Sequence, residues 1–417
     1  AVTTLARRLG LGDAVIIGLG SMIGAGVFAV WAPAAAAAGS WLLVSVGLAA
    51  LVAFCNAWSS ARLAARYPSS GGTYLYGREV LGEWWGFLAG WGFVIGKTAS
   101  CAAMALTFAS YVLPGSAWAR PLAALVVLAL ALLNTRGVTK TAALARALVI
   151  PVLVILIGAI GLMGLAAPLA SPALVAADAY GVLQAAGLLF FAFAGYARIA
   201  TMGEEVRDPS RTIPRAIIGA LTLTVALYAG LGWVLLARLG PDGLATSPDP
   251  VAAGVAATGV LWAEPLVRLA AALASAGALL GLVAGVGRTT LAMARNGDLP
   301  RRLAAVHPQY QVPHVAELTL GVVVAGLVLA VDLRGAIGFS SFGVLLYYVV
   351  ANLAAVRLDP TARSWTLAVP VLGMLGCVTL VATLPPMSVV AGLAVYVVGI
   401  LVRLTTHRHA LAAPPSE

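Results

Sequence analysis

Three glycines interrupt the first long apolar segment of the chain, in residues 20–28, which read GSMIGAGVF. Glycine destabilises a helix interior by about 1 kcal/mol relative to alanine. Backbone amide and carbonyl groups that a broken helix frees inside a membrane need protein, water or a bound solute as partners. The stretch therefore predicts a broken helix that lines a binding cavity. Its Gly20-to-Gly24 spacing would also suit close packing against another helix.

A second apolar segment carries a glycine among aromatic residues, in residues 189–198, which read LFFAFAGYAR. By order along the chain the two interrupted segments are helices 1 and 6. Breaks at matching places in two halves indicate a transporter built from inverted repeats, and five helices per repeat would give the two repeats opposite orientations. Phe190, Phe191 and Phe193 could instead simply fill a hydrophobic core. That would explain the aromatic residues, but not why the interruption of helix 6 falls at the place that corresponds to that of helix 1.

The composition indicates a membrane protein with many spans. Apolar residues make up 61% of the 417 residues and charged residues 10%, far from the composition of a soluble domain. Apolar runs of helical rather than barrel-strand length recur along the chain. We predict about twelve membrane helices, at residues 13–37, 40–63, 84–112, 121–134, 146–168, 181–202, 214–238, 265–290, 314–331, 335–356, 365–384 and 386–404.

The positions of Lys and Arg agree with this count. Most of them fall before helix 1 or after even-numbered helices, which predicts cytoplasmic N- and C-termini in the cell (inner) membrane. The net charge of +10 therefore reflects topology rather than a nucleic-acid surface, where basic residues would cluster. The residues before Asp13 lack the features of a cleavable signal, so helix 1 is expected to be retained.

Two other classes of membrane protein fit the sequence less well. An enzyme would need a buried nucleophile with its base, or a metal cluster, but all four histidines fall in predicted loops or the tail. A channel would more often show symmetric pore loops. Cys55, Cys101 and Cys377 fall in predicted helices without ligand-like spacing and are expected to be small buried hydrophobes. We expect no catalytic residues, no metal site and no cofactor.

Four motifs in this order resemble those of the amino acid, polyamine and organocation (APC) superfamily of permeases. The first is residues 20–28. The second is residues 67–74 (YPSSGGTY), leading to Gly82 and Trp91. The third is residues 190–196 (FFAFAGY) followed by 203–209 (GEEVRDP), Arg211 and 213–215 (IPR). The fourth is residues 293–300 (MARNGDLP), with His307-Pro308 and Pro313. The resemblance covers about helices 1 to 10.

The resemblance implies a prokaryotic amino-acid transporter with an all-α, five-plus-five inverted-repeat (LeuT-type) fold, in which helices 1 and 6 are broken. Residues 1–404 would form one transmembrane domain. Repeat one would cover about 13–168 and repeat two about 181–356, with scaffold helices 11 and 12 at about 365–404. A short cytoplasmic tail would follow at 405–417. The chain would work by alternating access, as a symporter or an exchanger.

The resemblance also implies where an amino acid would bind. The N–H groups of Gly24, Ala25 and Gly26 would hold its carboxylate, because helix N-termini favour anions. Backbone carbonyls of helices 1 and 6 would hold its ammonium, and Phe193, Tyr196, Ser100, Met104 and Ser275 would contribute to side-chain selectivity. The expected substrate-binding residues are Met22, Ile23, Gly24, Ala25, Gly26, Phe191, Ala192, Phe193, Ala194, Tyr196 and Ser275.

Two charged residues depart from the family pattern and are candidates for coupling or gating. Proton-coupled members often carry a lysine on helix 5, but residues 148–153 read LVIPVL, and Lys97 lies near the midpoint of helix 3 instead. A lysine at that depth needs a cavity or a partner, and burial favours its neutral form. Lys97 is therefore a candidate coupling group, or else its head reaches a cytoplasmic vestibule. Arg198 stays charged and could pair with a carbonyl or repel cationic substrates.

The predicted substrate is a small neutral amino acid. No Asp or Glu falls in the middle of a predicted helix, whereas a cationic amino acid or amine would favour a buried carboxylate. Carbonyls can also accept from ammonium groups, so a cationic substrate stays an alternative, as does an amino-acid sensor on the same fold. The expected partners are the substrate, membrane lipid and a proton or sodium ion, with no nucleic acid.

Overall fold

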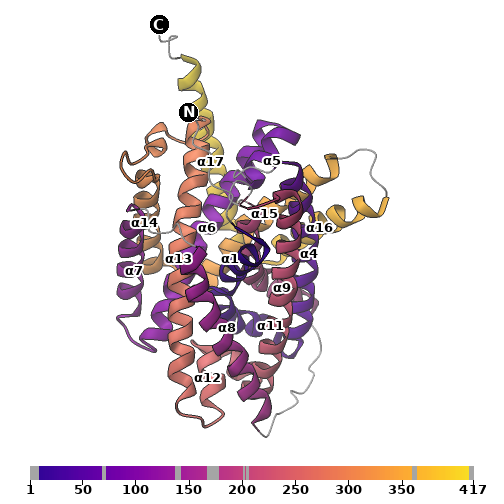
Figure 1. The fold of residues 1–417 in the computed structure, drawn as a ribbon, viewed down its shortest axis with the longest axis vertical. Helices are drawn as coiled ribbons and strands as arrows, with labels where there is room; N and C mark the ends of the chain where they lie inside the picture. Colours follow the sequence, from indigo (N-terminus) through magenta and orange to yellow (C-terminus); the bar gives the residue numbers. More distant parts are fainter. Residues whose placement is uncertain are drawn as a thin grey trace.

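The described part of the chain is helical. The computed structural model describes residues 9–67, 72–136, 142–166, 178–200, 202, 206–358 and 364–412. Within these ranges the elements are α-helices and short 3-10 helices, and an isolated bridge pairs Leu9 with Val206. Most helices follow the long axis of the molecule (Figure 1).

All twelve predicted segments are helical over most of their lengths. Their observed bounds are α1 (Leu11–Ile23), α2 (Gly26–Ala29) and α3 (Trp31–Ala38) for the first; α4 (Leu42–Arg66), α6 (Glu83–Val112), α7 (Ala119–Asn134) and α8 (Ala142–Leu165) for the next four; α9 (Ala179–Phe193), the 3-10 turn η2 (Ala194–Tyr196) and α10 (Ala197–Ala200) for the sixth; and α11 (Pro209–Thr246), α13 (Ala263–Arg295), α14 (His314–Ala330), α15 (Leu333–Arg357), α16 (Ser364–Thr383) and α17 (Pro386–Ala412) for the rest.

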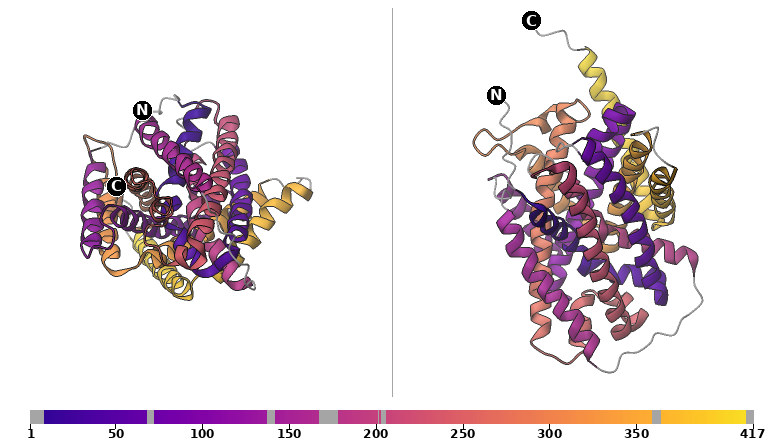
Figure 2. Two further views of the ribbon diagram at one scale, coloured as in Figure 1. Left: turned by 90° about the horizontal axis from the view of Figure 1, so that it is seen from below. Right: turned by 45° about the vertical axis from the view of Figure 1, so that its right-hand side comes forward.

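Ten helical segments of the described chain are long and apolar enough to cross a membrane. The helices α7 and α14 are apolar but shorter, and they pack side by side on one flank of the bundle (Figures 1 and 2). The chain is therefore a multi-pass membrane protein.

Two short helices in the connections were not predicted. The helix α5 (Gly72–Leu81) lies at the upper end of the molecule and α12 (Pro250–Ala256) at the lower end (Figure 1). Gly82, with φ of 109°, separates α5 from α6, and Gly240, with φ of 69°, kinks α11. Glycine adopts such left-handed conformations without a steric penalty. The kink explains why the predicted helix 214–238 is only part of α11.

A buried polar cluster joins three helices. The Asn352 side chain of α15 donates to Asn56 Oδ1 of α4 at 2.7 Å, and the Ser59 hydroxyl of α4 donates to Asn352 Oδ1 at 2.6 Å. The Asn56 amide also donates to the Cys377 sulfur of α16 at 3.2 Å. All three cysteines are buried, but Cys377 is a hydrogen-bonding partner rather than only a small hydrophobe.

A buried ionic cluster closes the end of the bundle that holds α5 and the C-terminal part of α17. Asp298, which is 0% exposed, forms ion pairs with Arg78 at 3.2 Å and Arg403 at 3.1 Å, and accepts a 2.7 Å bond from the Tyr74 hydroxyl. The Arg403 guanidinium also lies 4.2 Å from the centre of the Trp84 ring. These contacts fix α5, α6, α17 and the chain after α13 to one another.

Candidate substrate site at two broken helices

The first interruption lies where the glycines predict it. The helix α1 ends at Ile23 and α2 begins at Gly26. Gly24 has φ of −47° and ψ of −137°, outside the helical region. The last carbonyls of α1 and the first amides of α2 therefore meet at one level of the bundle, where helix ends lack intrahelical partners.

The second interruption is a tight turn rather than a gap. After Phe193 the chain passes through the 3-10 turn 194–196 and continues as α10. Every residue of this turn is buried. Helix 1 is thus interrupted by a non-helical residue, whereas helix 6 changes to 3-10 geometry for one turn and continues.

The two interruptions pack backbone against backbone. A Cβ added to Gly26 would lie 2.8 Å from Ala192 Cα. A Cβ added to Gly195 would collide with the backbone of Ser21 and Met22. Gly26 and Gly195 are therefore needed for the close approach of the two interrupted helices. Gly20 and Gly24 also lie in close contact with neighbours, but with two different helices: Gly20 packs against Val149 of α8 and Gly24 against Ala278 of α13.

Ten of the eleven predicted substrate-binding residues lie on the two interrupted helices and Ser275 lies on α13; all eleven are buried. Ser275 belongs to the part of α13 that packs against the first interruption. Near Gly24 lie the carbonyl of Ala274, the residue before Ser275, and the Cβ of Ala278, three residues after it. The Ser275 hydroxyl is buried and has no hydrogen-bond partner among the described residues. An unpartnered buried hydroxyl on a helix that packs against the first interruption could bind a polar group of a ligand.

Tyr228 of α11 occupies the junction and was missed by the sequence analysis. Its fully buried hydroxyl donates to Met22 O at 2.6 Å and reaches Ala192 O at 3.1 Å. Its ring lies 4.9 Å from that of Phe193. Two of the carbonyls expected to hold a substrate ammonium thus already have a protein donor. A tyrosine in an apolar helix gives no signal of this in the sequence.

Lys97 of α6 reaches the second interruption. It is 8% exposed, and its Nζ donates to Ala194 O at 3.4 Å. The ammonium therefore points to the 3-10 turn of helix 6 rather than into an open vestibule. Arg198, two residues beyond this turn, is half-buried and takes part in an interaction with its surroundings.

The other selectivity candidates differ in their surroundings. The Ser100 hydroxyl lies 2.6 Å from the Ser340 hydroxyl and so joins α6 to α15, while Met104 is buried in the core. The Tyr196 ring lies 5.3 Å from the ring of Tyr348 of α15, tilted by 32°, and Tyr348 is a second aromatic residue that the sequence analysis missed.

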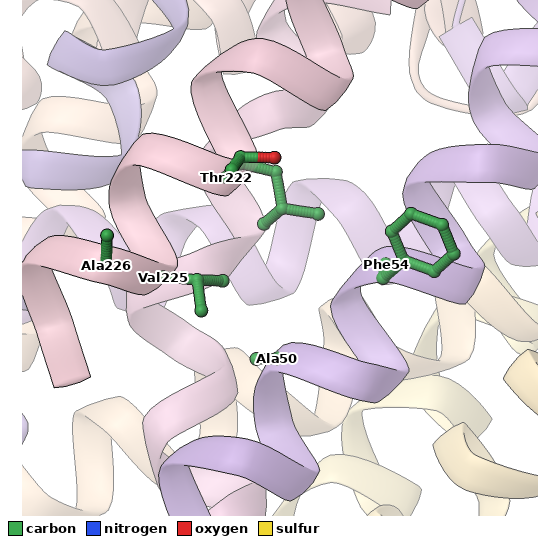
Figure 3. Close-up of a pocket in the computed structure, with 6 residues that line it drawn as sticks. Ala50, Phe54, Thr222, Val225 and Ala226 are labelled. Atoms are coloured by element: carbon green, nitrogen blue, oxygen red, sulfur yellow. The ribbon is translucent and has the colours of Figure 1, made fainter.

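A groove between α4 and α11 lies apart from the junction (Figure 3). It has a volume of about 310 Å³ and is lined by Ala50, Phe54, Leu221, Thr222, Val225 and Ala226. Its one hydroxyl, on Thr222, donates to Ile218 O within its own helix. This apolar lining suits a lipid chain, whereas an amino-acid zwitterion needs polar partners.

Several predicted features lie outside the described residues. They are residues 1–8, which include Arg7 and Arg8, residues 68–71 of the second motif, residues 203–205 of the third motif, and the end of the tail at 413–417.

The comparisons with known proteins agree with the motifs. The amino acid permease family model matches residues 9–407. An uncharacterized transporter of Mycobacterium tuberculosis is 58% identical over 400 residues, 95% of this chain and 90% of that protein. A branched-chain amino acid permease of Bacillus subtilis is 26% identical, over 96% of this chain and 92% of that protein. Human cationic amino acid transporter 4 is 30% identical, over 86% of this chain and 61% of that protein. The chain belongs to the amino acid permease family of the APC superfamily.

Proposed function

We propose that the chain is a secondary active transporter that moves a small neutral amino acid across the cell membrane by alternating access, as a symporter or an exchanger. The observation that carries this proposal is the junction of the two interrupted helices. Both interruptions lie in buried backbone at one place in the bundle, where carbonyl and amide groups are available to both ends of a zwitterion. Relatives described as amino acid permeases support the substrate class.

The proposed arrangement keeps the five-plus-five division, with repeats at about 13–168 and 181–356 and scaffold helices at 365–404 in one domain of residues 1–404. The N- and C-termini would be cytoplasmic, because Lys and Arg concentrate on that side. The cluster around Asp298 would then close the cytoplasmic end. The opposite end would carry the ion pairs of Arg268 with Asp249 at 2.6 Å and Glu264 at 2.8 Å.

The charges at the junction support a neutral substrate. Lys97 brings an ammonium to the turn of helix 6, and none of the eleven proposed substrate-binding residues carries a carboxylate. A cationic side chain would meet a like charge without compensation in a medium of low dielectric constant. Similarity to a cationic amino acid transporter makes cationic amino acids the second candidate class.

Lys97 is the proposed coupling group. When protonated, its ammonium would donate to Ala194 O and stabilise the turn of helix 6 in the conformation described here. When the proton is lost, that bond would weaken and the other conformation would be favoured.

Uptake by purified protein in proteoliposomes tests the proposal. Labelled neutral, cationic and acidic amino acids would be offered with a proton gradient, with a sodium gradient, and with unlabelled amino acid inside the vesicles. We expect saturable uptake of one or more neutral amino acids. Binding without flux under all three conditions would instead identify an amino-acid sensor.

A further inference from the structure

Tyr228 connects the ends of both interrupted helices through one hydroxyl group. Met22 and Ala192 are the penultimate residues of α1 and α9, so their carbonyls belong to the last turn, which lacks intrahelical donors. The Tyr228 hydroxyl lies 2.6 Å from one carbonyl oxygen and 3.1 Å from the other. It has a single proton to donate, so the two oxygens share one donor and converge on one point.

The ring of Tyr228 is held in place from both interrupted helices. Phe193 of α9 lies 4.9 Å away, and Trp31 of α3 meets the ring edge-on at 6.2 Å. The Trp31 indole is itself fixed by a 2.6 Å bond to Val27 O. The hydroxyl therefore has little freedom to leave the two carbonyls, and α11 holds the two helix ends at a fixed separation.

We propose that Tyr228 is the positioning residue of the amino-group subsite, an inference that rests on the proposed function. The negative ends of α1 and α9 attract a cation. Each carbonyl oxygen has two lone pairs and shares the one Tyr228 proton, so each keeps a lone pair for a second donor. By holding Met22 O and Ala192 O at one point, Tyr228 positions these two acceptors for an ammonium, which carries three N–H donors. Its effect is thus specific to the amino group of the substrate and does not extend to the carboxylate.

A pair of ligands that differ only in the amino group separates this role from a structural one. The ligands are the amino acid that is taken up best and the corresponding carboxylic acid without the amino group. Binding of both would be measured by calorimetry on wild type and on Tyr228→Phe, which removes one buried oxygen atom. We expect Tyr228→Phe to weaken binding of the amino acid about tenfold, and binding of the carboxylic acid by less than about threefold.

Tyr111→Phe is the matched control. Tyr111 is also buried, and its hydroxyl donates to another carbonyl of the first segment, Phe28 O, at 3.1 Å. This variant should leave the ratio of the two affinities as in wild type. A variant with 4-aminophenylalanine at position 228 keeps a donor at the same place and should restore the wild-type ratio.

The outcomes separate the inference from the proposed function. Equal weakening of both ligands in Tyr228→Phe, or no weakening, would overturn the inference and leave the transporter assignment intact. Failure of 4-aminophenylalanine to restore the ratio would also overturn it. A wild-type protein that binds no amino acid would overturn the proposed function, and this inference with it.

Discussion

The contact between Gly26 and Ala192 allows a quantitative prediction for Gly26→Ala. The added Cβ would lie 2.8 Å from Ala192 Cα and 2.9 Å from its Cβ. Carbon atoms in contact prefer about 3.5–4.0 Å, so α2 and α9 would have to separate by about 0.7 Å or more. Because one of the opposing atoms is backbone, no change of side-chain rotamer relieves the clash. Overpacking of this kind lowers the free energy of unfolding by about 1–3 kcal/mol.

Gly281→Ala is the control for the loss of glycine itself. Gly281 lies within α13, and a Cβ there meets no atom within 4 Å. This variant should leave stability unchanged or raise it by up to about 1 kcal/mol, because alanine is the better helix former. Only Gly26→Ala should also weaken substrate binding, since it moves the two helix ends apart.

Melting temperatures in one detergent and binding isotherms for the transported amino acid would test the pair. We expect Gly26→Ala to melt below wild type and bind more weakly, with Gly281→Ala unchanged in binding. If Gly26→Ala matches Gly281→Ala in both measurements, the backbone contact between the interrupted helices is not as described.

Three further predictions concern the ionic cluster, coupling and selectivity. Asp298→Asn removes the buried partner of Arg403, which keeps only its 3.8 Å pair to the exposed Glu83, and should lower stability by about 3–5 kcal/mol. Glu83→Gln removes that second, weaker pair at a side chain that is 63% exposed and should cost less than about 1 kcal/mol. Equal melting temperatures of the two variants would contradict the buried cluster as a stabilising element. Lys97→Met should abolish the pH dependence of transport and retain exchange. Its control, Arg198→Met, should change substrate affinity without altering the pH profile. A Lys97→Met variant with wild-type pH dependence and gradient coupling would exclude Lys97 as the coupling group. In competition assays neutral amino acids should inhibit uptake at lower concentrations than arginine, lysine or putrescine, and the reverse order would contradict a neutral substrate.

The helices could be predicted because apolar runs of membrane length are a strong signal. The interruption of helix 1 could be located for a similar reason, since Gly24 and Gly26 are unfavourable within a helix. The helices α5 and α12 were missed because they are short and lie in connections, where hydropathy carries little information. The helical part of α11 beyond residue 238 was missed because Gly240 and Pro241 read as an end, whereas the structure has a kink there.

The candidate site could be predicted only in its backbone. The types and spacing of residues 20–28 and 189–198 indicated where the helices would be interrupted, and the resemblance to the family implied which carbonyls and amides would bind a substrate. Tyr228 could not be found in this way, because its role depends on how α11 packs across both interruptions. The bond of Lys97 to Ala194 O was equally hidden. A charge at mid-membrane depth predicted that Lys97 needs a partner. The partner is a backbone carbonyl, and because every residue has one, the sequence cannot show which carbonyl it is.

Substrate protection of one introduced cysteine tests the central claim most directly, that the amino acid binds where the two interrupted helices meet. Ser275→Cys places a thiol on α13 next to Ala274, whose carbonyl lies near Gly24, with little change in size, and the native cysteines are buried. Thr289→Cys, on the same helix but about 21 Å away by the helical rise, is the control. The rate of alkylation by a small membrane-permeant reagent would be measured with and without saturating transported amino acid. We predict that the amino acid slows alkylation of Ser275→Cys and leaves that of Thr289→Cys unchanged, whereas an unchanged rate at Ser275→Cys would contradict this location of the site.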